Sequence, residues 1–315
     1  MATALILGAT GGIGHEVAGA LHRHGWQIRA LHRDPGKVGG DGRTPWIHWV
    51  KGDAMNAAAV TTAAEGASVI VHAVNPPGYR NWGQLVIPMI ESSIGAARAH
   101  GARILLPGTI YNYGPDSFPT LRENSPQQPL TRKGRIRVEL ERRLQDSGVR
   151  ALIVRAGDFF GPDAGNNWFS QGLVKPGQPV TSISYPGRSG VGHAWAYLPD
   201  LAETMAQLLD RQSTLGHFER FHFEGQWDPD GTRMTQAIRS VVGRSNIKIR
   251  AFPWALLTLL APFKTLFREM QEMRYLWEQP LRLDNRHLLE VLGAEPRTPL
   301  EQAVRATLHG LKCLT

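Results

Sequence analysis

A short apolar strand that breaks into a glycine-rich turn and then a helix forms the N-terminus of this 315-residue chain. The apolar run is Ala4–Leu7, the turn holds Gly8, Gly11 and Gly14, and a helical pattern follows over His15–His24. Glycines let the backbone approach a pyrophosphate, and the unpaired amides and dipole of a helix N-terminus favour its charge. The spacing is G-x-x-G-x-x-G rather than the dinucleotide fingerprint G-x-G-x-x-G, and a turn without a ligand is the alternative. The place of the glycines between a strand and a helix favours a nucleotide site.

Composition describes an ordinary soluble protein, with 42% hydrophobic and 20% charged residues. A net charge of +8 raises the question of a nucleic-acid partner. However, the basic residues are scattered, and the densest cluster, Arg132–Arg137, is explained equally well by a solvated helix face. We therefore expect no nucleic-acid partner.

Cysteine and histidine usage argues against a metal site. Cys313 is the only cysteine, so neither an intrachain disulfide nor a cysteine cluster is expected. The 12 histidines show no metal-ligand spacing such as H-E-x-x-H, and we predict no metal.

The N-terminus leads straight into a strand, which favours a cytoplasmic location. The most apolar run, Trp254–Phe267, is too short to span a bilayer and carries Pro262 and Lys264, so no membrane partner is expected.

Predicted strands and helices alternate over the first 155 residues. The predicted strands are 4–7, 26–32, 46–51, 67–73, 102–107 and 149–155, and the helices between them are 15–24, 57–65, 88–99 and 135–145. This alternation predicts an α/β fold with a Rossmann-type doubly wound parallel sheet. We expect a dinucleotide-binding domain over 1–160 plus about 190–215. A smaller, mostly helical substrate-binding region then covers about 161–189 and 216–315.

The end of the second predicted strand bears on which cofactor is bound. An acidic residue there holds the ribose hydroxyls of NAD, whereas a basic one accommodates the 2′-phosphate of NADP. The strand ends in Leu31-His32-Arg33, and Asp34 already lies in the turn. NADP is therefore favoured, with NAD as the alternative, unless Arg33 is only a surface turn residue. Asp53, after the third strand, is expected either to bind the adenine amino group or to cap the next helix.

These motifs together resemble the short-chain dehydrogenase/reductase superfamily, in particular its extended branch of NAD-dependent epimerases and dehydratases. The similar segments occur in order along the chain and are Gly8–Gly14, Gly52-Asp53, Val69–Ala73, Thr109–Pro115, Arg155–Pro162 and Trp195–Ala202. The resemblance implies hydride transfer with a nicotinamide cofactor. It also implies the cofactor contacts Gly8, Thr10, Gly11, Gly12, Ile13, Gly14, Arg33, Asp53, Ala54 and Ala73.

One motif departs from the family pattern. The family uses Tyr-x-x-x-Lys, in which the tyrosine exchanges a proton with the substrate and the lysine holds the nicotinamide ribose. At that place this sequence has Lys133 and Arg137, which share a helix face because they are four residues apart. We expect Lys133 to act as acid or base and Arg137 to bind a ribose hydroxyl or phosphate. Thr109 matches the residue that hydrogen-bonds the reacting oxygen. A plain basic helix face is the alternative.

The substrate is expected beyond the carboxyl ends of the strands, where aromatic and imidazole side chains gather. Candidate contacts are Asn75, Tyr111, Asp158, Phe159, His193 and Trp195, in segments that include 75–82, 158–160, 167–169 and 193–197. This composition suits a small, partly apolar molecule better than a nucleotide sugar. Tyr111 and Tyr113 are alternative proton donors, although Tyr113 is expected to pack structurally.

The C-terminal part is predicted to be helical. Residues 253–278 form one or two amphipathic helices, with Pro253 at a first helical position, and 300–311 form a final helix. Packing over the substrate cleft is favoured for the amphipathic segment over a dimer or membrane-surface contact.

The predicted function is that of an NAD(P)-dependent oxidoreductase or epimerase acting on a small carbonyl or alcohol. A non-catalytic NADP-binding sensor is the alternative. A homodimer is a further expectation from the resemblance.

Overall fold

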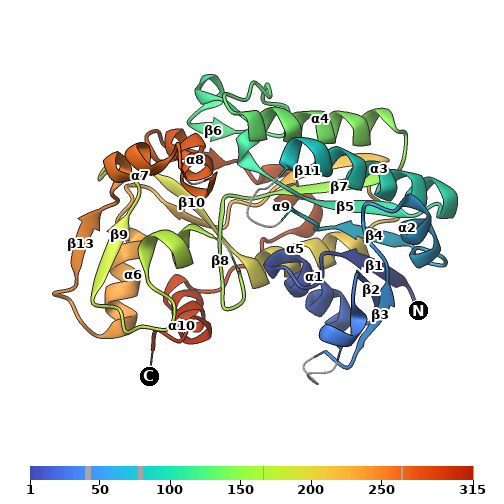
Figure 1. The fold of residues 1–315 in the computed structure, drawn as a ribbon, viewed down its shortest axis with the longest axis horizontal. Coiled ribbons are helices and arrows are strands. Elements are labelled where there is room, and N and C mark those ends of the chain that lie inside the picture. Colours follow the sequence, from blue (N-terminus) through green and yellow to red (C-terminus); the bar gives the residue numbers. More distant parts are fainter. Residues whose placement is uncertain (40–43, 77–80, 166, 264, 315) are drawn as a thin grey trace. The chain divides into compact units, whose positions relative to one another are not determined.

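The computed structural model describes residues 1–39, 44–76, 81–165, 167–263 and 265–314 (Figure 1). Within these ranges the chain forms two compact units, each assembled from separate segments. Unit 1 comprises Met1–Asn112, Arg132–Arg155 and Ala202–Phe221, and unit 2 comprises Tyr113–Thr131, Ala156–Leu201 and His222–Thr315. Each unit has its own cluster of buried apolar side chains. Residues 77–80 of the predicted substrate segment lie outside the described residues.

The core of unit 1 is one sheet whose seven described strands have the order β11-β7-β5-β4-β1-β2-β3. They are β1 (Thr3–Leu7), β2 (Gln27–His32), β3 (Ile47–Lys51), β4 (Val69–His72), β5 (Arg103–Gly108), β7 (Ala151–Arg155) and β11 (Phe218–His222). The pairs β3–β2, β2–β1, β1–β4, β4–β5 and β5–β7 are parallel. The strand order reverses between β1 and β4, so the doubly wound sheet predicted from the sequence is confirmed.

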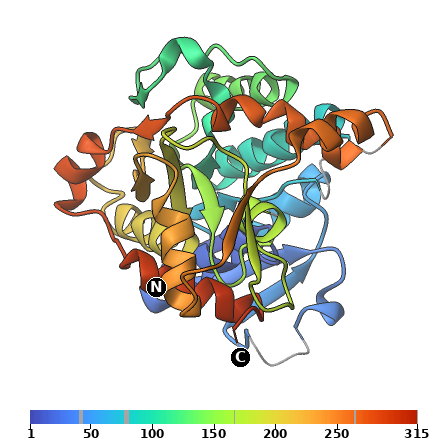
Figure 2. The same cartoon turned by 90° about the vertical axis from the view of Figure 1, so that its left-hand side faces the viewer.

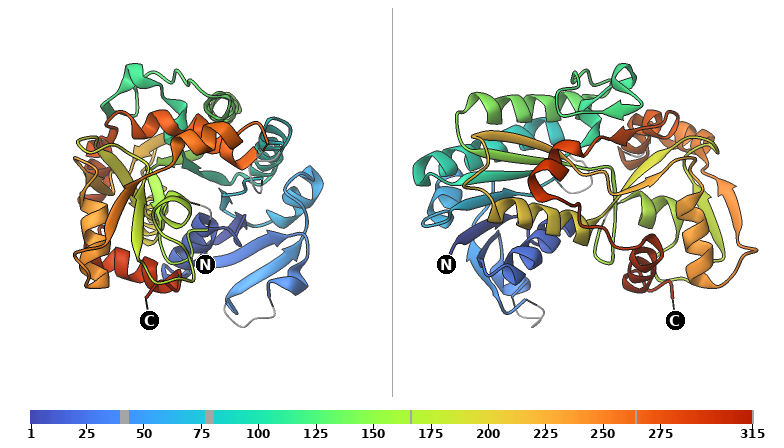
Figure 3. Two further views of the ribbon diagram at one scale, coloured as in Figure 1. Left: turned by 60° about the vertical axis from the view of Figure 1, so that its left-hand side comes forward. Right: turned by 180° about the vertical axis from the view of Figure 1, so that it is seen from behind.

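Helices cover both faces of this sheet (Figure 1, Figure 3). α2 (Ala57–Ala63), α3 (Trp82–His100) and α4 (Arg132–Asp146) lie side by side over one face. α1 (Gly12–Arg23) and α5 (Leu198–Asp210) lie over the other. All four residues of β4 are buried, as expected for a strand covered on both sides.

The predicted start of the helix at Pro88 was wrong. α3 begins at Trp82, and Pro88 lies inside it. The apolar stripe that holds the helix against the core already starts before the proline, with Trp82 and Val86 both buried. A proline removes one backbone hydrogen bond from a helix, and this packed stripe offsets that loss.

Unit 2 contains three small sheets in its described part: β12-β10-β8, β13-β9 and β14-β6. The strands are β6 (Thr120–Leu121), β8 (Asp158–Phe160), β9 (Ser182–Tyr185), β10 (His193–Tyr197), β12 (Gln226–Asp228), β13 (Lys248–Ala251) and β14 (Arg282–Leu283). The helices are α6 (Arg233–Val242), α7 (Trp254–Leu260), α8 (Thr265–Glu272), α9 (Arg286–Leu292) and α10 (Leu300–Gly310). α6 and α10 lie side by side (Figure 2, Figure 3), and Ile238 and Val304 belong to the buried cluster there.

The amphipathic segment forms α7 and α8, and Pro253 immediately precedes α7 rather than occupying its first helical position. Nowhere in the described ranges is a helix both long and apolar enough to cross a membrane.

The boundaries of the two units differ from those predicted, because pairing between distant strands decides them. Residues 113–131 belong to unit 2, where β6 pairs with β14. Residues 156–160 and 190–201 also belong to unit 2, because β8 and β10 pair with each other. Residues 216–221 belong to unit 1, because β11 is the strand next to β7 in the seven-stranded sheet.

Candidate functional site

The turn after β1 is built so that only glycine fits at two positions. Gly8 has φ +95°, and a Cβ atom there would lie 2.6 Å from the carbonyl oxygen of Ala73. A Cβ atom on Gly14 would overlap the carbonyl oxygen of Gly8. The Gly11 amide donates to that same Gly8 oxygen at 2.9 Å. The missing side chains thus bring α1 close against the end of β1.

The first turn of α1 presents its backbone amides without a side-chain cap. Gly11 is the N-cap residue, no side chain caps the helix, and no acidic residue lies in the first turn. The first backbone bond of the helix is His15 N–H to Gly11 O, at 2.8 Å. The amides of Gly12, Ile13 and Gly14 precede it and have no helical acceptor. Such a helix end favours a phosphate group.

A hollow of about 500 Å³ lies next to this turn, wholly within unit 1, at the carboxyl ends of β1, β2 and β4. It brings together the following predicted residues: Gly8, Thr10, Gly11, Arg33, Asp53, Ala54, Ala73 and Asn75. Gly12, Ile13, Gly14 and Tyr111 are not among the residues that line it. A cavity of this size at the strand-order reversal is where open α/β sheets bind their ligands.

The charged side chain that follows β2 and lines the hollow, Arg33, is basic. Arg33 is exposed and lines the hollow. Asp34 does not line it, and its carboxylate is paired with Lys37, with 3.1 Å between Oδ2 and Nζ. Asp34, which the sequence places in the turn, is thus paired away from the hollow, whereas the neighbouring Arg33 lines it.

Asp53 does not cap α2. Asn56 is the N-cap residue and accepts from the Ala59 amide at 3.0 Å. Asp53 Oδ1 accepts from the Met55 amide at 2.9 Å in the turn before the helix. The helix-capping alternative for Asp53 was therefore wrong.

Thr109 is held by a buried polar network in unit 1. Its hydroxyl donates to Asn112 Oδ1 at 2.9 Å, and Asn112 Nδ2 donates to Glu141 Oε1 at 2.9 Å. The Thr109 carbonyl oxygen accepts from Arg155. The network fixes the orientation of the hydroxyl that was predicted to contact the reacting oxygen.

Lys133 and Arg137 lie on successive turns of α4. Lys133 is only 2% exposed, so it does not belong to a solvated basic face. The guanidinium carbon of Arg137 lies 5.0 Å from the ring centroid of Trp82. Burial, and to a smaller extent the charge of Arg137, lowers the pKa of His72 from 6.5 to about 3. Arg137 is therefore close to the carboxyl end of β4.

The remaining predicted residues, Asp158, Phe159, His193 and Trp195, lie in unit 2. His193 Nε2 and Asp158 Oδ2 are 2.8 Å apart, and β10 pairs with β8 so that Trp195 is opposite Asp158. His193 is buried, and its ring stacks on Trp277, with 3.7 Å between centroids and 10° between planes. Tyr113 is also buried in unit 2, edge-to-face against His222, in keeping with the expected packing role.

Sequence reasoning missed several residues of this region. Met55, Leu85 and Met89 line the hollow in unit 1. Leu85 was missed because α3 was predicted to begin later than it does. Trp277 lies in the segment 253–278 that was predicted to form amphipathic helices, and its stacking on His193 depends on a contact between distant segments. No local pattern signals such a contact.

Comparison with known proteins gives two kinds of match. A family model described as NAD(P)H-binding matches residues 8–184. A 3-diazoavenalumate denitrifying reductase from a Streptomyces species is 31% identical over 179 residues. That match covers 51% of this chain and 57% of the relative, so the chain spans little more than half the length of the curated relative.

Solved structures of epimerases share the fold over nearly the whole chain. UDP-glucose 4-epimerase from Brucella ovis, solved with NAD, has a TM-score of 0.76 at 16% identity, and 99% of each chain is covered. UDP-glucuronic acid 4-epimerase from Bacillus cereus, solved with UDP-glucuronic acid and NAD, has a TM-score of 0.75 at 13% identity. That match covers 98% of this chain and 99% of the epimerase. At such identities the likeness concerns the fold.

Proposed function

Because this chain belongs to the NAD(P)H-binding family, we propose that it is an NADPH-dependent reductase that transfers hydride to a small, partly apolar acceptor. The resemblance to the extended short-chain dehydrogenases/reductases is confirmed by the family match and by the epimerase fold. The observation that carries the proposal is the hollow in unit 1, which joins the glycine turn to the exposed Arg33.

The residues of the hollow fit a dinucleotide. Gly8 and Gly14 let α1 approach the end of β1 closely, which would place a pyrophosphate against the amides of Gly12 and Ile13. Arg33 provides a charge-assisted partner for a 2′-phosphate. Asp53 would take the adenine side, with Ala54, Ala73 and Asn75 along the wall. When bound, the nicotinamide supplies the hydride.

The proposed catalytic residues are Thr109, Lys133 and Arg137. On release of its bond to Asn112 Oδ1, the Thr109 hydroxyl would donate to the acceptor oxygen and orient it. Lys133 as an ammonium would donate the proton that a reduced carbonyl oxygen requires, and Arg137 would stabilise negative charge nearby. The contacts proposed for the acceptor within unit 1 are Asn75, which lines the hollow, and Tyr111.

A second acceptor class is favoured by the name of the Streptomyces relative, a reductase of a diazo compound. In hydride reduction of an aryl diazonium group, the carbon–nitrogen bond breaks, N₂ leaves and a carbon–hydrogen bond replaces it. No oxygen takes up a proton in that conversion, so it would not need Lys133 as an acid. Reduction of a carbonyl would therefore require Lys133 as a proton donor, whereas reduction of a diazonium group would not.

The cofactor assignment is tested by fluorescence titration with NADPH and NADH. We expect wild type to bind NADPH more tightly than NADH. Arg33→Ala should weaken NADPH binding about tenfold or more and leave NADH binding nearly unchanged. Arg211→Ala is the matched control, because Arg211 is also exposed in unit 1 but does not line the hollow. Absence of binding by either nucleotide would overturn the proposal.

The acceptor is then sought with panels of aromatic and aliphatic carbonyls and of aryl diazonium salts, by following NADPH oxidation. Loss of carbonyl reduction in Lys133→Met would support the proton-donor role. Retention of diazonium reduction in the same variant would support the second class. NADPH binding without turnover of either panel would support the sensor instead.

A further inference from the structure

A second hollow, of about 480 Å³, lies wholly within unit 2 and has a wall rich in arginine. Its charged lining residues are Arg233, Arg282, Arg297 and a single acid, Glu224. The arginines come from three segments: the start of α6, β14 and the stretch between α9 and α10. All three are exposed, so their guanidinium groups are accessible to a ligand.

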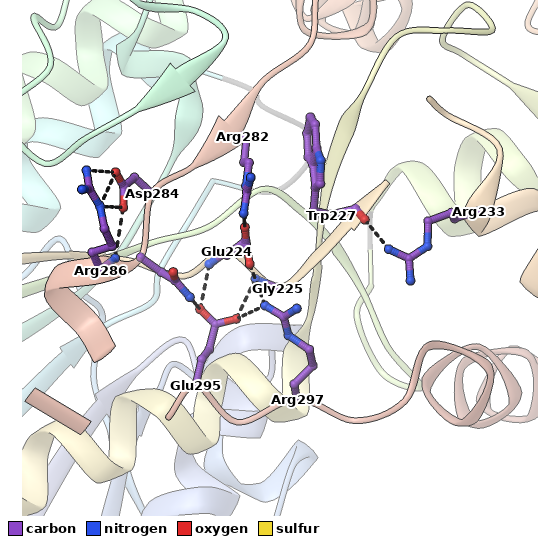
Figure 4. Close-up of polar contacts among 10 residues, drawn as sticks. Glu224, Gly225, Trp227, Arg233, Arg282, Asp284, Arg286, Glu295 and Arg297 are labelled. Atoms are coloured by element: carbon purple, nitrogen blue, oxygen red, sulfur yellow. Dashed lines mark hydrogen bonds and ion pairs between the residues drawn. The ribbon is translucent and has the colours of Figure 1, made fainter. Parts of the chain in front are cut away.

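Glu224 is shared by two of these arginines. Arg282 and Arg297 meet its carboxylate from opposite sides (Figure 4). The distances are 2.5 Å from Arg282 Nε to Oε1 and 2.8 Å from Arg297 Nη2 to Oε2. Because one carboxylate serves two guanidinium groups, the wall retains positive charge.

Glu295 lies behind the wall and does not remove this excess. It is only 3% exposed and does not line the hollow. Its oxygens accept from the backbone amides of Glu224 and Gly225, each at 2.9 Å, as well as from Asn285 and Arg297. Its structural task is to hold the Glu224–Gly225 turn in place, which in turn holds the two arginines.

Arg233 and Trp227 form the other side of the hollow. Arg233 Nη1 donates to the Trp227 carbonyl oxygen at 2.9 Å, and no other described residue accepts from this guanidinium. A Cβ atom on Gly192 would overlap the indole ring of Trp227, so the backbone packs tightly against that ring. This side of the hollow is thus lined by an oriented guanidinium and by Trp227, whose ring is held in place.

We propose that this hollow binds a small molecule that carries an oxyanion, carboxylate or phosphate, on a planar ring. Guanidinium groups bind both oxyanions through paired N–H donors, and those already oriented by other contacts lose less entropy on binding. The indole of Trp227 adds a surface on which a ring stacks. The volume lies in the range of small-molecule sites. This site is independent of the proposed hydride-transfer function.

The test uses isothermal titration calorimetry on the full chain, at low ionic strength in a buffer without phosphate. Phenyl phosphate and benzoate probe the two oxyanions on a ring, inorganic phosphate probes the anion alone, and phenol probes the ring alone. We expect phenyl phosphate to bind more tightly than inorganic phosphate and phenol to show no binding. A preference for benzoate would assign the natural group as a carboxylate.

Two variants and a control separate the contributions. Arg233→Gln should weaken phenyl phosphate binding about tenfold, because one charge-assisted pair is lost. Trp227→Leu should abolish the advantage of phenyl phosphate over inorganic phosphate. Arg305→Gln, which replaces an exposed arginine of α10 that does not line the hollow, should bind like wild type.

Three results would overturn the assignment. They are the absence of binding by both phenyl phosphate and benzoate, equal weakening in Arg233→Gln and Arg305→Gln, and displacement of the probe by saturating NADPH. Displacement by NADPH would show that the probe occupies the cofactor site. In that case Arg33→Ala, rather than Arg233→Gln, would weaken binding of the probe.

Discussion

Glu141 of α4 accepts hydrogen bonds from Nη2 of Arg155 through both carboxylate oxygens, at 2.9 and 2.8 Å, and both side chains are almost completely buried. The pair joins α4 to the end of β7. Through Asn112 and the carbonyl oxygen of Thr109, the same pair fixes the turn that presents the Thr109 hydroxyl. The hydrogen-bond network that contains the buried Glu141–Arg155 pair therefore also holds Thr109, a proposed catalytic residue.

Glu141→Gln should lower the free energy of unfolding by about 3–5 kcal/mol, because it leaves the buried charge of Arg155 without its counter-charge. Urea denaturation measures this loss. Glu139→Gln on the same helix is the control, since Glu139 forms surface pairs with Arg142 and Arg143 and should matter far less. Equal losses in both variants would contradict the structural importance of the buried pair.

Gly14→Ala should destabilise the protein by about 1–3 kcal/mol or more and abolish NADPH binding, because the new Cβ atom overlaps the Gly8 carbonyl oxygen. Gly19→Ala in the same helix adds a Cβ atom that meets only the end of the Arg23 side chain, at 3.6 Å from Nη1, within the part of the chain that the structure describes. It should be neutral or stabilise by about 0.5–1 kcal/mol. Thermal unfolding and the fluorescence titration report the two effects. Undiminished NADPH binding in Gly14→Ala would mean that the turn does not hold the cofactor.

His72 should make the protein less stable in acid. Its pKa is 6.5 when unfolded and about 3 in the folded protein, so below pH 6.5 protons bind the unfolded chain preferentially. The free energy of unfolding should therefore fall between pH 6.5 and 3, by about 3 kcal/mol at pH 4.5 from this group. Urea denaturation at pH 7.5 and 4.5 measures the change. His72→Gln should show a smaller fall than wild type, and an identical fall would exclude this role.

His24 should make the protein less stable as the pH rises, the opposite of the effect of His72. Burial tends to lower its pKa, but hydrogen bonds and charges from Asp210 and Glu203 outweigh burial, and the pKa is raised above 6.5. Its stabilising contribution is present in full below pH 6.5 and is lost as pH rises through the folded-state pKa. Wild type should lose more stability than His24→Gln between pH 5.5 and 8.5, as followed by urea denaturation. A smaller loss in wild type than in His24→Gln would contradict the raised pKa of His24.

The fold of unit 1 was predictable because its signals are local. Apolar runs, the glycine turn and the alternation of strands with helices each extend over a few residues. The strands β1 to β5 and β7 agree with the predicted ones to within a few residues at each end, whereas β11 was not predicted. Where α3 begins was not predictable in this way, because Pro88 is a strong local signal and the packing of Trp82 outweighs it.

The candidate site was only partly predictable for a related reason. Residues adjacent to the glycine turn and to strand ends gather as expected, because carboxyl ends of parallel strands meet at one edge. The pairing of β6 with β14 and the stacking of His193 on Trp277 join segments that are far apart in the sequence. Such contacts depend on tertiary packing, which hydrophobic periodicity does not encode.

The interleaving of the two units has a consequence for synthesis. β11 supplies the strand beside β7, and its residues, Phe218–His222, follow all the segments of the sheet that they complete. During translation β7 is therefore an exposed sheet edge until the ribosome has released residue 222. Exposed edges invite pairing with other chains. A nascent chain stalled before that point would carry a sheet in which β7, as well as β3, is an edge strand, and β7 would be open to pairing with another chain.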